Sequence, residues 1–313
     1  MTNRMKAVSF AEFGGPEVLE LVELDRPEPG QGEVLVRVRA TSVNPADWKI
    51  RSGKVGGDLV TLPAVLGLDV SGVVERTGEG VTGFAPGDEV YGLPFPRLGG
   101  YAEYLVTGED TLARKPPGLD HVHAAALPSA GLTAWQALVR VAGVSAGQRV
   151  LVHAAAGGVG HLAVQIAKAR GAHVLGTASA AKHEFLRGLG IDEPIDYSST
   201  DFAEAAGEVD AVLDLVGGDY GKRSLPALRR GGILLCASGA ADPDTEEAAA
   251  AHGVLFHRFY VSPSAADLDS LSELIESERL RVDVGQVLPL AEAAEAHRLS
   301  ETGRVRGKIV LTL

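Results

Sequence analysis

The alternation of hydrophobic and polar residues divides the chain into two parts with different periods. In the first part, short runs with β-like alternation are separated by glycine and proline, and no 3.6-residue period is visible. These runs lie at residues 5–10, 19–24, 33–40, 68–75, 88–91 and 101–106. This part is therefore predicted to form a β-rich domain.

From about residue 124 onward, helical stretches separate the strand-like runs. The strands expected there lie at 149–153, 173–177, 194–197, 209–216, 232–236 and 254–260. Strands that alternate with helices are typical of βαβ units and of a parallel sheet, so the fold class is α/β. We then expect helices at 265–278 and up to about residue 300, and a final strand at 308–313 that returns to the β-rich domain.

The segment 150–168 joins an apolar strand, a turn of small residues and an amphipathic helix. Gly157 and Gly160 allow the backbone to approach a pyrophosphate and the helix to pack on the strand, while the helix N-terminus faces the negative charge. Ala155 replaces the first glycine of the usual G-x-G-x-x-G motif, so the surrounding strand and helix carry the prediction. A glycine-rich turn in an ordinary βαβ unit is the alternative. The residues predicted to hold a dinucleotide here are Ala156, Gly157, Gly158, Val159 and Gly160.

The end of the next strand indicates which dinucleotide binds. NAD sites place an acidic residue about 20 residues beyond the motif, but no acidic residue follows 173–177 until Glu184. A carboxylate would repel the 2′-phosphate of NADP, whereas the hydroxyls of Thr177 and Ser179 can donate to it and Lys182 adds a positive charge. The sequence therefore predicts NADPH as the cofactor. The alternative for Lys182 is a solvated lysine at the start of a helix.

Composition excludes several classes of partner. The 313 residues are enough for two domains, and a net charge of −12 argues against a nucleic-acid or an anionic membrane surface. No stretch reaches the roughly 18 apolar residues of a membrane span, and the N-terminus has no apolar signal region. We expect a cytoplasmic protein that acts on a small molecule.

Cysteine and histidine usage gives no indication of a metal. The single cysteine, Cys236, lies in an apolar strand-like run, where a buried thiol behaves as a small hydrophobic group. His121 and His123 form a pair without further ligands at metal-binding spacing. The prediction is a site without a metal.

Several segments, in order along the whole chain, resemble those of one enzyme superfamily. They lie at 43–53, 66–74, 99–104, 127–136, 155–160 and 303–311. The chain resembles the medium-chain dehydrogenase/reductases, and within them the zinc-free quinone oxidoreductase (zeta-crystallin-like) branch. This resemblance implies a GroES-like β-rich catalytic domain at 1–123 and 264–313, a doubly wound Rossmann NADPH-binding domain at 124–263, and a homodimer.

The resemblance also separates this chain from the zinc alcohol dehydrogenases. Those enzymes carry a cysteine ligand in the segment equivalent to 44–47 and Gly-His-Glu near 67–69. This chain has Asn44 in the first segment and Gly67-Leu68-Asp69 in the second. Alcohol oxidation with zinc is therefore not expected.

Further cofactor contacts are implied by the resemblance alone. Asn44 and Thr133 match residues near the nicotinamide and its ribose, and Tyr197 matches a tyrosine by the 2′-phosphate. The predicted additional cofactor residues are Ser238, Tyr260, Val261 and Lys308, with Gly307 beside the lysine. Alternatives remain, because Asn44 before Pro45 can also start a turn and Thr133 can face a helix surface.

Lys49 departs from the pattern of many quinone reductases, which have a tyrosine there. A lysine resembles the enone and alkenal reductases of the same branch. An ammonium group can donate a hydrogen bond or a proton to a carbonyl oxygen as negative charge develops. An exposed lysine on a loop or short helix is the alternative, and Asp47 can cap that helix.

Together these features predict an NADPH-dependent oxidoreductase. We expect hydride transfer to a quinone or to a C=C bond conjugated with a carbonyl, with Lys49 and Asn44 as the catalytic residues. Lys49 favours the conjugated carbonyl slightly over the quinone. A non-catalytic, crystallin-like NADPH-binding protein is the alternative.

Overall fold

The computed structural model describes residues 4–239 and 241–313, which form two compact units. Unit 1 contains Met1–Ser129, Ser262–Glu276 and Val282–Leu313, and unit 2 contains Ala130–Val261 and Ser277–Arg281. The domain boundaries that the sequence suggested remain a prediction. None of the helices in the described ranges is long and apolar enough to cross a membrane.

Unit 1 is built around a seven-stranded sheet with the order β15-β16-β3-β5-β6-β8, with β7 also paired to β3. Its strands are β3 (Glu33–Val43), β5 (Val70–Thr77), β6 (Glu89–Gly92), β7 (Tyr104–Gly108), β8 (Leu112–Arg114), β15 (Val284–Pro289) and β16 (Lys308–Thr312). Alternate residues of β3 (Val34, Val36 and Val38) enter an apolar core, as the period of two predicts. β16 pairs antiparallel with β3, so the C-terminal strand returns to the β-rich part as expected.

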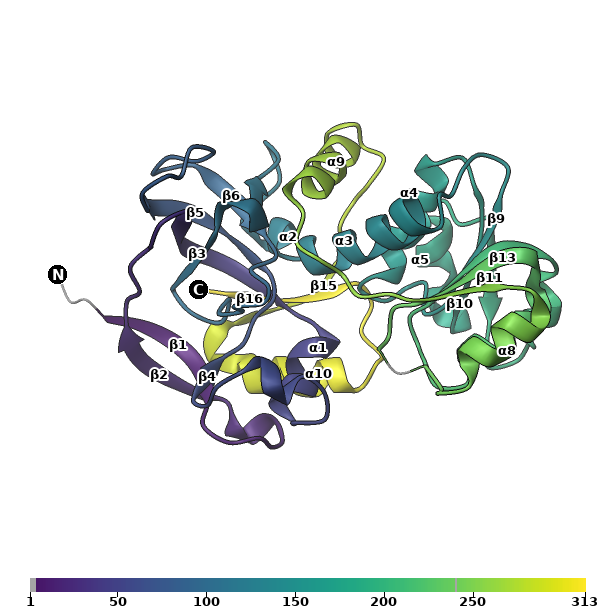
Figure 1. The fold of residues 1–313 in the computed structure, drawn as a ribbon, viewed down its shortest axis with the longest axis horizontal. Helices are drawn as coiled ribbons and strands as arrows, with labels where there is room; N and C mark the ends of the chain where they lie inside the picture. The colour runs from purple at the N-terminus through teal and green to yellow at the C-terminus, as the bar shows by residue number, and fades with distance from the viewer. Residues whose placement is uncertain (1–3, 240) are drawn as a thin grey trace. The chain divides into compact units, whose positions relative to one another are not determined.

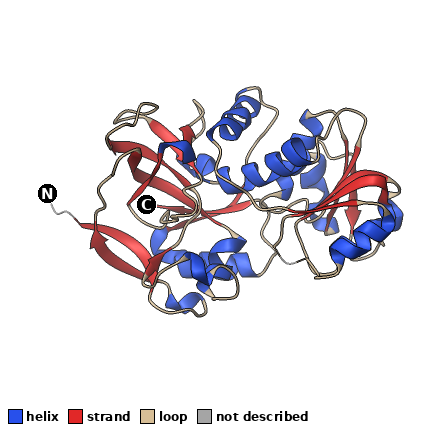
Figure 2. Ribbon diagram, in the orientation of Figure 1, coloured by secondary structure: helices blue, strands red, loops and turns tan. Residues whose placement is uncertain are grey.

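Shorter elements complete unit 1. A small sheet has the order β2-β1-β4. Its strands are β1 (Arg4–Phe10), β2 (Glu20–Asp25) and β4 (Ala64–Val65), and the helices are α1 (Pro45–Arg51), α2 (His121–Ala125), α9 (Ala265–Glu276) and α10 (Ala293–Glu301). Figure 2 shows this part of the chain as mainly strands and connecting loops. The helices expected at 265–278 and up to about residue 300 are present as α9 and α10. The β4 strand was not predicted, because an element this short leaves no periodic signal.

Unit 2 is a parallel six-stranded sheet with the order β11-β10-β9-β12-β13-β14. Its strands are β9 (Arg149–Val152), β10 (His173–Ala178), β11 (Glu193–Asp196), β12 (Val209–Asp214), β13 (Leu228–Cys236) and β14 (Leu255–Arg258). The helices are α4 (Gly160–Ala169), α5 (His183–Arg187), α6 (Phe202–Ala206), α7 (Tyr220–Ser224) and α8 (Thr245–His252), and α3 (Pro128–Trp135) begins just before the unit. Figure 1 shows α4 and α8 on opposite sides of this sheet.

The strand order of unit 2 determines where a ligand can bind. From β9 the chain first builds outward through β10 and β11, and then returns to β12 on the other side of β9. Doubly wound sheets bind their ligands outside the carboxyl ends of the strands at such a reversal. The fold therefore points to the turn after β9, which is the turn that the glycine motif indicated.

Candidate functional site

The turn between β9 and α4 needs glycine at one position in particular. A Cβ atom on Gly160 would lie 2.3 Å from the Ala154 carbonyl oxygen, so any other residue would push the helix away from the strand. The same carbonyl accepts a hydrogen bond from the Gly157 N–H at 2.9 Å. Ala154 itself has a φ of 49°, in the left-handed region that non-glycine residues rarely adopt. The predicted strand, turn and helix are all present.

Thr177 and Ser179 lie in different environments at the end of β10. Thr177 is only 1% exposed, and its hydroxyl is hydrogen-bonded to the His153 ring at 3.1 Å and to the Ala154 N–H at 3.2 Å. Ser179 and Lys182 are partly exposed in the segment that follows the strand. The Thr177 hydroxyl is thus engaged within the protein, whereas Ser179 and Lys182 lie in the partly exposed segment beyond the strand.

Other residues of the predicted cofactor set also follow the carboxyl ends of strands. Tyr197 comes directly after β11 and is 49% exposed, and Tyr260 lies two residues beyond β14 and is 69% exposed. Ser238 follows β13 in the same way. Because the carboxyl ends of parallel strands share one edge, the topology brings these residues to the edge that carries the glycine turn. Thr133 is different, since it is buried in α3.

In unit 1, α1 begins with a reciprocal cap. The Asn44 N–H donates to the Asp47 carboxylate at 2.8 Å, and a capping box joins Asn44 and Asp47 at the start of the helix. Pro45 occupies the first helical position, where its missing N–H costs nothing. The sequence-based suggestion that Asp47 caps this helix is confirmed.

The Asn44 side chain is held between a carboxylate and an ammonium group. Its amide nitrogen donates to Asp69 at 2.8 Å, and its amide oxygen accepts from the Lys308 ammonium. Lys308 is 4% exposed and lies 3.5 Å from Asp69. The two hydrogen bonds fix the orientation of the amide. The opposite orientation would place the amide nitrogen against the Lys308 ammonium and the amide oxygen against the Asp69 carboxylate.

Asp69 is the residue of this cluster that sequence reasoning missed. It is fully buried, and it also accepts hydrogen bonds from the Ser129 N–H at 2.7 Å and from the Ser42 hydroxyl. In the sequence, Asp69 stands out only as a departure from a zinc-ligand motif. Its partners come from three separate segments of the chain, so only the folded structure brings them together.

Asp47 joins a second buried network. Burial raises the pKa of Asp47 to about 7, against the opposing effect of the N–H groups of Asn44 and Gly67. Burial also lowers the pKa of His297 to about 3, so this ring is neutral. Arg51 donates to one ring nitrogen at 3.1 Å, and the other therefore carries the proton and donates to the Tyr101 hydroxyl at 3.0 Å. Tyr101 is in turn hydrogen-bonded to Asp47.

Lys49 lies on α1 with its side chain half-buried. Its ammonium nitrogen is 5.6 Å from the centre of the Trp48 ring. Burial lowers the pKa of Lys49, because a poorly hydrated ammonium group is less stable relative to the neutral amine. A lysine in this state releases a proton more readily than a solvated one.

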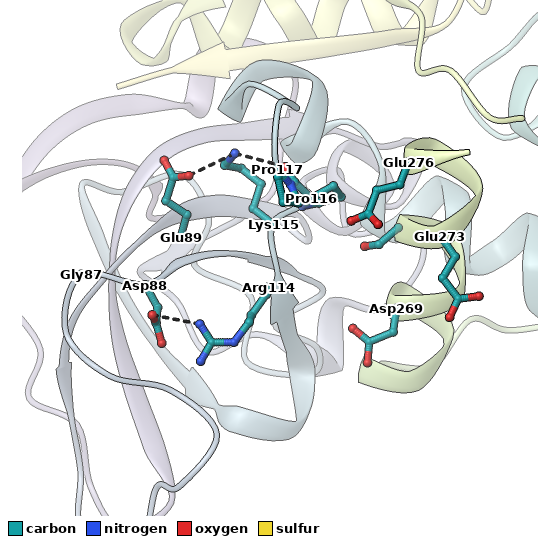
Figure 3. A pocket seen from close by; sticks show the side chains of 11 residues that line it. Gly87, Asp88, Glu89, Arg114, Lys115, Pro116, Pro117, Asp269, Glu273 and Glu276 are labelled. Atoms are coloured by element: carbon teal, nitrogen blue, oxygen red, sulfur yellow. Dashed lines mark hydrogen bonds and ion pairs between the residues drawn. The ribbon is translucent and has the colours of Figure 1, made fainter. Parts of the chain in front are cut away.

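A groove of about 520 Å³ in unit 1 lies apart from these residues (Figure 3). On one side, Arg114 pairs with Asp88 at 2.9 Å and Lys115 pairs with Glu89 at 3.2 Å. Its other wall is formed by α9, with acidic side chains at residues 269, 273 and 276. No residue of the predicted site lines this groove.

The described residues contain no group of three or more histidine, cysteine or acidic side chains placed to hold a metal ion. His121 and His123 take part in separate contacts, to Ser71 at 2.8 Å and to Asp120 at 2.8 Å. Asp69 accepts hydrogen bonds on both carboxylate oxygens and has a lysine ammonium beside it. Its environment is therefore that of a hydrogen-bond acceptor paired with a cation.

Comparison with known proteins places the chain in a family. Residues 30–118 match the alcohol dehydrogenase GroES-like domain, and residues 189–311 match a family described as zinc-binding dehydrogenase. The NADPH-dependent alkenal/one oxidoreductase of Arabidopsis thaliana is 36% identical over 98% of this chain and 79% of its own length.

Two solved structures are similar over nearly their full length. The quinone oxidoreductase from Coxiella burnetii has a TM-score of 0.95 and 40% identity, with 99% of each chain covered. The Escherichia coli quinone oxidoreductase complexed with NADPH has a TM-score of 0.91 and 32% identity, with 98% of this chain and all of the other covered. The chain belongs to the medium-chain dehydrogenase/reductase superfamily, in the branch of quinone oxidoreductases and alkenal/one reductases.

Proposed function

We propose that this protein is a zinc-independent reductase that uses NADPH to reduce a quinone or a C=C bond conjugated with a carbonyl. Support for the reaction class comes from family membership, and support for the chemistry comes from the residues. The observation that carries the proposal is the carboxyl edge of unit 2, where a glycine turn and a strand end without an acidic residue occur together. Quinones and α,β-unsaturated carbonyls are the proposed substrates.

The residues at this edge fit a dinucleotide with a 2′-phosphate. Gly157 carries no side chain that would cover the turn, Gly160 lets α4 begin close to β9, and the positive end of the α4 dipole favours the negative charge of a pyrophosphate. Ser179, Lys182 and Tyr197 are the residues proposed to contact the 2′-phosphate. Thr177 is proposed to act through the turn, because its hydroxyl is already engaged there.

NADPH, when bound, supplies the hydride. The protein's own task is then to stabilise the negative charge that develops on the oxygen of the acceptor and to deliver a proton. Lys49 is proposed as the donor to that oxygen, since its lowered pKa makes proton release easier. Asn44 is proposed to contact the nicotinamide and its ribose through its side-chain amide. Asp69 and Lys308 hold the orientation of this amide.

Lys49 favours the conjugated carbonyl over the quinone as the acceptor. Reduction of an enone produces an enolate, which is strongly basic and needs a proton, whereas a hydroquinone anion is a weaker base. A donor such as Lys49 therefore contributes more to the first reaction. A homodimer and a cytoplasmic location remain predictions from the sequence.

The test measures NADPH oxidation by the purified protein with matched panels of enones and quinones, together with direct binding of NADPH and NADH. The proposal expects turnover with NADPH and tighter binding of NADPH than of NADH. Binding without turnover of any acceptor would instead support a non-catalytic NADPH-binding protein. Equal affinity for the two dinucleotides would refute the proposed 2′-phosphate contacts.

A further inference from the structure

A chain of hydrogen bonds runs from the interior of unit 2 to the glycine turn. The ring of His153 is fully buried, with one nitrogen 2.8 Å from the Ser224 hydroxyl and the other 3.1 Å from the Thr177 hydroxyl. Ser224 donates to the Tyr220 carbonyl at 2.7 Å. At the other end, Thr177 accepts from the Ala154 N–H at 3.2 Å.

These contacts determine where each proton lies. Burial lowers the pKa of His153 to about 3, so the ring is neutral and has one donor and one acceptor nitrogen. Because Ser224 already donates to Tyr220, the His153 nitrogen that faces it must be the donor. The other nitrogen of His153 therefore accepts from Thr177, and the Thr177 oxygen remains available for the Ala154 N–H.

Ala154 is the residue of the turn that this series of hydrogen bonds contacts, through its N–H group. Its left-handed φ of 49° is unfavourable for a residue with a Cβ atom. Two hydrogen bonds from β10 counter this preference on either side of the strained residue, since Thr177 also accepts the Ala155 N–H at 3.0 Å through its carbonyl. The Ala154 carbonyl, aimed by this conformation, accepts from Gly157 and lies against Gly160.

We propose that His153 is a positioning residue for dinucleotide binding, which acts through the Thr177 hydroxyl to hold Ala154 in the conformation that shapes the phosphate turn. The inference rests on the proposed function, because it assumes that the turn binds the pyrophosphate of NADPH. His153 itself is fully buried, so it acts on the nucleotide only through this turn.

Two substitutions interrupt this series of hydrogen bonds, one at His153 and one at Thr177. His153→Phe keeps a ring against Phe202 and Tyr220, whose centres lie 4.6 and 5.2 Å away, but removes the acceptor for Thr177. Thr177→Val keeps the branched shape and removes the hydroxyl, whereas Thr177→Ser retains the hydroxyl and is the matched control. If His153→Phe fails to fold, Thr177→Val tests the same link.

The experiment compares the dissociation constants of NADPH and of adenosine 2′-monophosphate, which has a 2′-phosphate but no pyrophosphate. For His153→Phe and Thr177→Val we expect binding of NADPH to weaken about tenfold, as for the loss of one or two hydrogen bonds. The dissociation constant of the monophosphate should change less than about twofold in both variants. Thr177→Ser, which retains the hydroxyl, should bind NADPH as the wild type does.

Either of two results would overturn the inference alone. One is unchanged NADPH affinity in both variants, and the other is an equal loss for both ligands, which would indicate a general structural role. If the wild-type protein binds no NADPH, the proposed function fails as well. A circular dichroism spectrum of each variant confirms that the protein measured is folded.

Discussion

Replacement of Asp69 by asparagine tests the buried cluster that Asn44, Asp69 and Lys308 form in unit 1. Asp69 accepts hydrogen bonds from Asn44, Ser42 and the Ser129 N–H, and it neutralises the buried Lys308. Asparagine has nearly the same shape, but one of its two groups is a donor. Whichever way it is oriented, that NH₂ faces groups that are themselves donors.

The size of the effect follows from burial. Asp69 is 0% exposed and Lys308 is 4% exposed, so water cannot replace the lost partner. Removal of one member of a buried charge pair costs about 3–5 kcal/mol in free energy of unfolding. We therefore expect Asp69→Asn to lower the free energy of unfolding by about that amount, measured by urea denaturation followed by circular dichroism.

Asp25→Asn is the matched control. Asp25 pairs with Arg4 at 3.0 Å, but its side chain is 83% exposed, and water can replace the pair. We expect the control to unfold at the same urea concentration as the wild type. A loss below about 1 kcal/mol for Asp69→Asn, the range of exposed pairs, would refute the claim that this carboxylate organises the cluster.

Other predictions address the cofactor, the proton donor, pH and metal. Lys182→Ala should weaken NADPH binding about tenfold, equivalent to about 1.4 kcal/mol, while NADH binding in the same titration stays unchanged. Lys49→Met should lower kcat at saturating NADPH with little effect on the dissociation constant of NADPH, and an unchanged kcat would exclude Lys49 from proton delivery. The pKa of buried His297 is about 3 in the folded protein, against an ordinary value of 6.5. Between these two pH values the unfolded protein binds a proton that the folded protein does not, so the free energy of unfolding falls as the pH is lowered from 6.5 to about 3. His297→Gln should accordingly reduce the slope of unfolding free energy against pH by about 1.4 kcal/mol per pH unit in that range. The same slope in the variant and the wild type would show that the His297 ring is already charged in the folded protein. Dialysis against a metal chelator should leave turnover intact, whereas a loss that zinc restores would contradict the zinc-independent assignment.

Much of the fold could be predicted because its signals are local. The strand, small-residue turn and helix at 149–169 are adjacent in sequence, and their order alone indicates a nucleotide-binding unit. The return of the C-terminal strand to the β-rich part was expected because this strand follows the nucleotide-binding unit in the chain. Its partner, β3, lies more than 250 residues away in the chain, as the pairing of Ile309 with Val43 shows.

The site was less predictable because its contacts depend on distant segments. Asn44 and Lys308 were chosen by resemblance, but nothing local shows that Asp69 joins them. Thr177 was predicted to face the nucleotide, and only the buried His153 ring explains why its hydroxyl points inward. Spacing along a strand shows which residues alternate but not which hydroxyl finds a partner inside.

Reduction of an acceptor with NADPH is the activity proposed for this protein, and a turnover assay measures it. Purified protein is mixed with NADPH and, in parallel, with NADH, against matched enones and quinones, and oxidation of the cofactor is followed spectrophotometrically. We expect turnover with NADPH in clear preference to NADH, and faster turnover of enones than of quinones. Absence of turnover with both acceptor classes, or equal rates with NADPH and NADH, would contradict this expectation.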